Sequence, residues 1–226
     1  HGQYWYMSCY FGLVLIAPFL NQAVLTLKNE QLLPIVSGAF IYFSVIPTVF
    51  KPDILGLWGG YSVLWMILLY TIGAIIRKSN YESRFQIRNV SGFILFLTSL
   101  TFILCWLGFE QWRSYISPTV TLQGIAIFLL FLNIKVIPLT VKRLVLLISP
   151  LTLGVYLFHV HPLIFRRIIP TIHTLVEEQE FPIFVIMILV MTLALFFSGA
   201  MIEYFRNKLM AYILTLIKSV KNLKQA

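Results

Sequence analysis

Charged side chains are scarce in this sequence, and acidic ones especially so. Only 11% of the 226 residues are Asp, Glu, Lys or Arg, and 8 residues are acidic. Hydrophobic residues make up 59% of the chain, and the mean hydropathy is +0.89. A soluble domain needs more polar surface around its core than this. The composition therefore excludes an ordinary soluble protein and predicts a polytopic membrane protein.

Cysteine and metal-binding patterns are also lacking. Cys9 and Cys105 both fall inside predicted spans and lack metal-ligand spacing, so we expect them to be packing residues. The histidines do not form an HExxH motif, and two histidines alone make a weak catalytic zinc site. No metal is therefore expected.

The sequence has no Gly/Ser-rich or Pro-rich linker and no convincing repeat of fixed period. We therefore predict one helical domain over residues 1–202. A basic amphipathic tail at 203–226 is expected to lie on the anionic inner leaflet. The chain starts at His1 and enters an apolar run without a signal peptide, which favours a fragment whose upstream helices are missing.

Seven apolar stretches are long enough, or nearly so, to cross a bilayer as helices of about 20 residues. Their approximate extents are 4–24, 32–50, 56–76, 91–109, 117–134, 144–165 and 181–202. The expected fold is all-α, a polytopic bundle of about seven transmembrane helices.

The basic residues predict the orientation of this bundle. When successive loops are assigned to alternate sides, 13 of the 17 Lys and Arg residues fall on one side and 4 on the other. The positive-inside rule then places the N-terminus outside and the C-terminus in the cytoplasm. Because the basic residues are grouped in short loops between apolar runs, they indicate topology and not nucleic-acid binding.

The densest internal basic cluster is the predicted cytoplasmic loop at residues 77–88, which contains Arg77, Arg84 and Arg88. Two interpretations remain open. A solvated loop of this charge is sufficient to set the topology. Guanidinium groups also bind phosphate oxygens in a bidentate manner, so the same loop can hold the phosphates of a nucleotide-linked donor.

Two of the four histidines lie in an apolar run, where ionisable groups are costly and indicate a functional site. Tyr156 precedes His159 by three residues and shares its helix face. His161 points about 200° away in an unbroken helix, but Pro162 disrupts the helix and can bring both imidazoles to one cavity. Ordinary core histidines remain the alternative interpretation for both.

We expect this span to begin near Leu144 and to kink at Pro150. At 1.5 Å per residue, His159 then lies about 22 Å from the inner edge, in the outer third of the bilayer. The connection at 166–180 is expected to be an exposed outer loop.

Residues 154–159, followed by His161-Pro162-Leu163, resemble a late transmembrane segment of the bacterial acyltransferase family 3 membrane proteins. The likeness is to the surface polysaccharide O-acyltransferase-like group in particular. Three further stretches agree with that family in order along the chain, at residues 4–21, 60–77 and 202–206. The resemblance implies further helices upstream, which would carry the family's basic residue and histidine motif. It therefore implies that these 226 residues alone are inactive.

The resemblance further implies a multi-pass O-acyltransferase, and more specifically an O-acetyltransferase, in the bacterial cytoplasmic membrane. The donor would be a cytoplasmic acyl-coenzyme A such as acetyl-coenzyme A. The acceptor would be a hydroxyl of a cell-surface polysaccharide or of its lipid-linked glycan precursor, and membrane lipid would surround the protein.

Residue roles follow from the same resemblance. His159 would be a supporting base or orienting group, because an imidazole with a pKa near 6.5 suits proton removal near neutrality. His161 is the second candidate, and Tyr156 would be a hydrogen-bond partner. The contacts to the donor phosphates would be Arg77, Arg84 and Arg88.

Two other functions remain open from the residues. Broken helices and membrane histidines also suit a transporter or flippase for a glycan or small solute. A non-catalytic scaffold would tolerate neutral replacement of both histidines.

Overall fold

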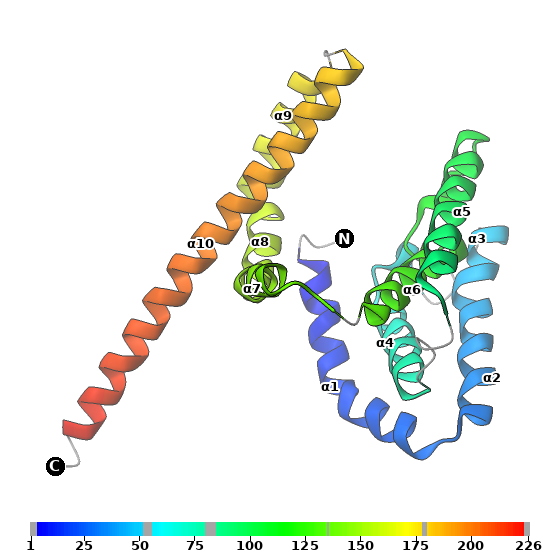
Figure 1. The fold of residues 1–226 in the computed structure, drawn as a ribbon, viewed down its shortest axis with the longest axis horizontal. Coiled ribbons are helices and arrows are strands. Elements are labelled where there is room, and N and C mark those ends of the chain that lie inside the picture. Colours follow the sequence, from blue (N-terminus) through cyan, green and yellow to red (C-terminus); the bar gives the residue numbers. More distant parts are fainter. Residues whose placement is uncertain (1–3, 52–55, 80–84, 135, 178–179, 224–226) are drawn as a thin grey trace. The chain divides into compact units, whose positions relative to one another are not determined.

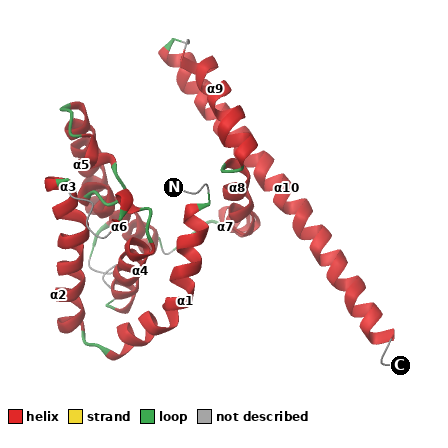
Figure 2. Ribbon diagram, turned by 180° about the vertical axis from the view of Figure 1, so that it is seen from behind, coloured by secondary structure: helices red, strands yellow, loops and turns green. Residues whose placement is uncertain are grey.

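The computed structural model describes residues 4–51, 56–79, 85–134, 136–177 and 180–223. Every regular element in these ranges is a helix (Figure 2), which confirms the predicted all-α class. The chain forms two compact units, residues 1–136 and residues 137–226. Each unit has its own helix packing.

The described helices of the first unit pack mainly as neighbouring pairs (Figure 1). Helix α1 packs along α4, and α5 packs along α6. In chain order the elements are α1 (Trp5–Thr26), α2 (Asn29–Phe40), the π-helix η1 (Ile41–Val45), α3 (Ile46–Phe50), the 3₁₀ turn η3 (Trp58–Gly60), α4 (Val63–Lys78), α5 (Ile87–Trp106), the 3₁₀ turn η5 (Glu110–Arg113) and α6 (Pro118–Asn133).

Two apolar clusters and one exposed side-chain hydrogen bond connect elements of the first unit. The hydroxyl of Tyr70 in α4 donates to Oδ1 of Asn21 in α1 at 2.8 Å, which gives this amide a partner within the span. The two apolar clusters are Val24, Leu32 and Ile75, and Trp65, Leu68 and Ile116.

Six helical segments in the described part of the chain are long and apolar enough to cross a membrane. They are Trp5–Thr26, Asn29–Phe50, Ile87–Trp106, Glu110–Asn133, Leu139–His159 and Pro182–Thr215.

The span predicted at 56–76 is the exception among the seven. Helix α4 begins only at Val63 and has 16 residues, which is about 24 Å of helix. Its start is fixed by Ser62, whose side chain accepts a hydrogen bond from the backbone N–H of Trp65. The preceding turn contains Gly59 and Gly60 at positive φ, which the helix cannot include.

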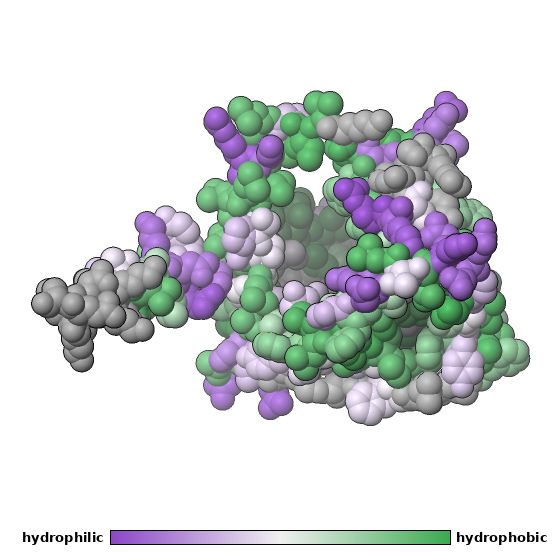
Figure 3. Space-filling view, turned by 90° about the horizontal axis from the view of Figure 1, so that it is seen from below, coloured by the Kyte–Doolittle hydropathy of each residue, from purple (hydrophilic) through white to green (hydrophobic). Residues whose placement is uncertain are grey.

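Large apolar side chains are exposed on the helices. Trp106 is 81% exposed and Phe19 is 77% exposed, and Figure 3 shows wide hydrophobic areas on the visible face. A soluble protein does not expose apolar surface on this scale. Together with the helix lengths, this shows a multi-pass membrane protein whose apolar surface faces hydrocarbon.

The second unit is dominated by one long helix, with shorter helices packed beside it (Figure 1). Its described elements are α7 (Leu139–Ile148), the 3₁₀ turn η6 (Ser149–Leu151), α8 (Thr152–His159), the π-helix η7 (Ile164–Ile168), α9 (Ile169–Glu177) and α10 (Phe181–Leu223). The predicted kink at Pro150 is confirmed, because the 3₁₀ turn that contains it separates α7 from α8.

The loop predicted at 166–180 is wrong for residues 166–177, which are helical, whereas the predicted exposure is confirmed for most of the side chains described there. The chain resumes a helical path after Pro162, through η7 and α9, and α9 packs against α10. The apolar residues among the charges allow this pairing, so a charge-rich segment becomes part of a helical hairpin.

Helix α10 has 43 residues, about 65 Å of helix, which exceeds the roughly 30 Å of hydrocarbon in a bilayer. It passes through the predicted boundary at 202/203 without interruption. The cytoplasmic placement of the tail at 203–226 and the orientation of the termini stay predictions.

Candidate functional site

Helix α8 places Tyr156 and His159 together, as their three-residue spacing predicts. The two rings meet edge to face, with centroids 5.5 Å apart and an interplanar angle of 79°. Both side chains are half-buried. The contact restricts the imidazole to one side of α8 while part of it remains accessible.

The hydrogen bonding of His159 determines what its ring can do. Its Nδ1 lies 3.1 Å from the carbonyl oxygen of Val155. A carbonyl oxygen only accepts, so this bond requires the hydrogen on Nδ1. The neutral ring then presents Nε2 as a proton acceptor, which is the form that a general base needs.

His161 lies in a different local environment. Helix α8 ends at His159, and the backbone N–H of His161 donates to the carbonyl of Phe158 at 3.1 Å. The His161 side chain is exposed, and its Nδ1 accepts from the N–H of Leu163 at 3.4 Å. Its ring therefore carries hydrogen on Nε2 when neutral, the reverse of His159. In the described structure the break at Pro162 gives the two imidazoles separate backbone partners.

Close helix packing fixes α8 against α10. Gly154 is buried, and a Cβ at that position would lie 2.6 Å from Oε2 of Glu203 in α10. Gly199 makes the reciprocal approach, since a Cβ there would lie 2.9 Å from the Cα of Val155. Small residues at such contacts let membrane helices approach closely.

Glu203 itself is 5% exposed and is held by an arginine one turn further along α10. Nε of Arg206 donates to Oε2 of Glu203 at 2.7 Å, and its second nitrogen donates to Oε1 at 2.6 Å. This bidentate pair satisfies a carboxylate next to an apolar helix contact. Both residues lie in the stretch 202–206 that resembles the family, but no role was predicted for them, although an acid and an arginine three residues apart share a helix face.

The predicted donor-binding arginines occupy the ends of neighbouring helices. Arg77 lies in the last turn of α4 and Arg88 in the first turn of α5, and both are exposed. Residues 79–86 connect the two helices in the sequence. Arg84 lies outside the described residues.

Lys78, from the same basic cluster, has a structural role. Its Nζ donates to the carbonyls of Val24 and Leu27 at 2.6 and 2.7 Å. These carbonyls belong to the end of α1, where a helix leaves acceptors without intrahelical partners. The cluster therefore contains a helix-capping lysine beside the exposed arginines.

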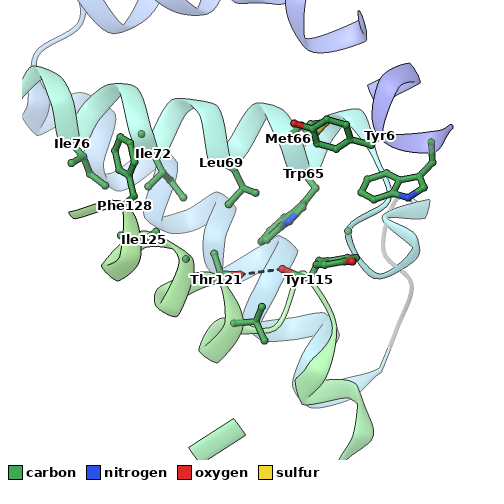
Figure 4. Close-up of a pocket in the computed structure, with 15 residues that line it drawn as sticks. Tyr6, Trp65, Met66, Leu69, Ile72, Ile76, Tyr115, Thr121, Ile125 and Phe128 are labelled. Carbon is green, nitrogen blue, oxygen red and sulfur yellow. Dashed lines mark hydrogen bonds between the residues drawn. The ribbon is translucent and has the colours of Figure 1, made fainter. Parts of the chain in front are cut away.

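A cavity of about 620 Å³ lies in the first unit, which no sequence pattern predicted. One face of α4 and one face of α6 form its long walls (Figure 4). Ile76 and Phe128 lie at one end, and Tyr6 and Tyr115 at the other. The lining from these two helices is Trp65, Met66, Leu69, Ile72, Gly73 and Ile76, with Val120, Thr121, Gly124, Ile125 and Phe128.

Three aromatic rings cluster beside one end of this cavity. Tyr61 lies with its ring 4.5 Å from that of Trp5 and 5.3 Å from that of Tyr115, by centroids. Gly60 permits this approach: its φ is +106°, and a Cβ there would lie 2.7 Å from the Cβ of Tyr115. Burial, together with the neighbouring Tyr115 phenol, raises the pKa of Tyr61.

The sequence profile of a protein family described as an acyltransferase domain matches residues 1–216. No curated protein and no solved structure matches the chain.

Proposed function

The chain belongs to the acyltransferase 3 family, and from this premise we propose that it takes part in O-acetyl transfer at the membrane. It is a membrane acyltransferase by its family and its apolar helices. The proposed donor is cytoplasmic acetyl-coenzyme A. The proposed acceptor is a hydroxyl of a cell-surface polysaccharide or of its lipid-linked precursor, and the proposed location is the bacterial cytoplasmic membrane.

The proposal depends mainly on the tautomer of His159 and on the partial exposure of its ring. Its Nδ1 donates a hydrogen bond to the Val155 carbonyl oxygen, so Nε2 is the nitrogen that can accept a proton. The ring is only half-buried. As the acceptor oxygen attacks the thioester carbonyl carbon, Nε2 takes or orients the hydroxyl proton. The new C–O bond forms, the C–S bond breaks, and the coenzyme A sulfur leaves and receives a proton.

Two neighbours support this role. Tyr156 holds the imidazole through the edge-to-face contact and supplies a phenol near it. The pair of Glu203 and Arg206 stabilises the α10 surface on which Gly154 packs, and so keeps α8 in register. His161, with its exposed ring and Nε2 hydrogen, is the secondary candidate, as a donor to the substrate.

The donor phosphates are proposed to bind at the exposed arginines of the first unit. Arg77 lies in the last turn of α4 and Arg88 in the first turn of α5, and Arg84 lies between them in the sequence. Bidentate guanidinium contacts suit a diphosphate better than lysine contacts do. Lys78 is excluded from this role because its Nζ caps α1.

The experiment uses membranes that contain the whole protein, supplied with acetyl-coenzyme A labelled in the acetyl group. The expected result is label that moves to the glycan fraction and is released by mild alkali, as an ester requires. Membranes without the protein serve as the control. Movement of glycan across the membrane without chemical change would overturn the proposal and favour a transporter, which the broken helix at His159 also suits.

A further inference from the structure

Helix α7 turns away from the helix pair formed by α8 and α10. Helix α8 packs along α10, and the 3₁₀ turn η6 still contacts α10. Pro150 in this turn has no N–H to bond to the carbonyl of Leu146, which interrupts the helix. In Figure 1 α7 is seen almost end-on while α10 runs across the picture, so the two helix axes cross steeply. A helix that crosses a membrane-spanning partner in this way runs along the membrane and not through it.

The turn η6 lies level with the end of the apolar part of α10. Gly154 of α8 lies against Glu203, and Val155 lies against Gly199, so the two helices run antiparallel. Because η6 ends three residues before Gly154, it lies level with the residues that follow Glu203 in α10.

The charged part of α10 marks one surface of the membrane. Residues 182–202 contain no charged side chain, and Glu203 begins a charged stretch that ends at Lys208. About 20 apolar residues are the length that crosses the hydrocarbon. Nζ of Lys208 lies 4.8 Å from the centroid of the Tyr204 ring, and tyrosine is enriched where a membrane meets water. The turn η6 therefore lies at this surface as well.

The sequence of α7 is amphipathic. Lys142 and Arg143 lie on one side of the helix. The opposite side has apolar residues at helical spacing, which are Val141, Leu144, Val145 and Ile148. No side chain of α7 is buried, and all those from Val141 to Leu147 are exposed. Such a helix lies in a membrane surface with its apolar side among the acyl chains.

The basic side of α7 lacks acidic partners in the part of the chain that the structure describes. Helix α7 contains no Asp or Glu, and neither Lys142 nor Arg143 forms an ion pair with a described residue. On α10 the charge of Arg206 is balanced by Glu203, which leaves the exposed Lys208 as a further positive charge at this surface. Anionic phospholipid head groups are the complementary charge that a membrane surface provides.

We propose that α7 lies in the plane of the membrane, at the surface marked by the charged part of α10, and binds the head groups of anionic phospholipids through Lys142 and Arg143. Lys208 lies at the same surface and adds to the attraction. This inference goes beyond the proposed function and does not depend on acetyl transfer.

The proposal changes where the span that carries His159 begins. The helical path from Thr152 to Glu177 is longer than the roughly 20 residues that a crossing needs, so α7 is not required for it. His159 then lies about 12 Å from the surface at η6, nearer the middle of the bilayer than a start near Leu144 implies. Arg166 lies about 22 Å from that surface, where a long side chain reaches towards the opposite head groups.

Nitroxide labels test the orientation of α7 in the whole protein, reconstituted in nanodiscs of phosphatidylcholine and phosphatidylglycerol. Two pairs of single cysteines, each seven residues apart, are placed in a cysteine-free background. Val141→Cys and Ile148→Cys lie on the apolar side, and Thr140→Cys and Leu147→Cys lie on the other. Relative accessibility to oxygen and to a nickel chelate gives the depth of each label. We expect equal depths within each pair and a greater depth for the apolar pair.

A photoreactive phosphatidylglycerol, present in trace amounts in phosphatidylcholine nanodiscs, tests the lipid site. The diazirine is in the head group, and mass spectrometry should find label on α7 at 139–148. Lys142→Gln combined with Arg143→Gln should lower this labelling about 25-fold, because each basic residue near anionic head groups contributes about fivefold in affinity. Arg166→Gln combined with Arg167→Gln is the matched control, since it removes the same charge from η7 and should leave the labelling of α7 unchanged.

Four results would overturn the proposal. A depth difference of about 10 Å within either pair of labels would show that α7 runs through the membrane. Low accessibility of all four labels to both oxygen and the nickel chelate would show that protein, and not lipid, covers α7. Equal labelling of α7 by photoreactive phosphatidylcholine, or an equal loss in the control variant, would remove the anionic lipid site. Displacement of the label by coenzyme A or inorganic phosphate would assign the basic side to a soluble phosphate compound instead.

Discussion

Gly154 of α8 lies directly against the side chain of Glu203 of α10, and a Cβ at residue 154 would overlap that side chain. The two residues are 49 positions apart in the sequence. Their contact accounts both for the need for glycine at 154 and for the burial of Glu203. The carboxylate is buried because α8 comes this close, and both of its oxygens accept hydrogen bonds from Arg206. The contact positions the helix that carries Tyr156 and His159.

Gly154→Ala is therefore expected to destabilise the protein by about 1–3 kcal/mol, the usual cost of forcing a methyl group into a packed contact. Thermal unfolding of the detergent-solubilised protein measures this. Gly92→Ala provides the comparison, because a methyl group there meets nothing and alanine favours the helix. Equal melting temperatures for the two variants would contradict the packing described for α8.

Arg206→Met is expected to lower the melting temperature more than Glu203→Gln. Removing the guanidinium leaves a 5% exposed carboxylate without its bidentate partner, whereas a glutamine keeps the size of the side chain and can still accept from Arg206. Parallel thermal melts of the two variants give the order. The reverse order would show that the carboxylate does not depend on this arginine.

Local patterns in the sequence predicted the membrane helices, the kink at Pro150 and the shared face of Tyr156 and His159. Each of these depends on residues within a few turns. The helical course of 166–177 was missed because charged residues suggested a loop, while α9 gains a packing partner only when α10 lies beside it.

The cavity was missed for a related physical reason. The glycines at 73 and 124 have the same sequence signature as the packing glycines at 154 and 199. Only the atoms that surround each glycine in the structure distinguish one that lets a neighbouring helix pack closely from one that borders open space. The arginines were recognised correctly as a cluster, but the capping bonds of Lys78 join residues about fifty positions apart.

Mutation of the basic cluster at residues 77–88 is expected to have two different effects, one on stability and one on donor binding. Lys78→Met is expected to lower stability by about 1–2 kcal/mol, because two carbonyls at the end of α1 lose their donor. Arg84→Ala combined with Arg88→Ala should leave the melting temperature unchanged and raise the apparent KM for acetyl-coenzyme A. Thermal melts and donor titrations on the same preparations test both statements. If the arginine variant alters only membrane insertion or orientation, the loop serves topology alone.

Tyr156→Phe is expected to keep the edge-to-face contact, since the ring is retained, and to lower acetyl transfer less than His159→Ala does. Tyr156→Ala removes the ring as well and should approach the loss seen for His159→Ala. Initial rates at saturating donor, with protein levels matched by immunoblot, give the comparison. A loss in Tyr156→Phe as large as in Tyr156→Ala would assign the phenol oxygen, and not the ring contact, as the important group.

The most direct measurement for the account as a whole is acetylation of the glycan by the whole protein carrying His159→Ala, beside the unaltered protein and His161→Ala, at equal membrane levels. Loss of a general base typically costs about 100-fold or more in rate. The account predicts a loss of about that size for His159→Ala, a smaller one for His161→Ala, and unchanged melting temperatures. Acetylation by His159→Ala at the unaltered rate would remove this histidine from the mechanism and contradict the account.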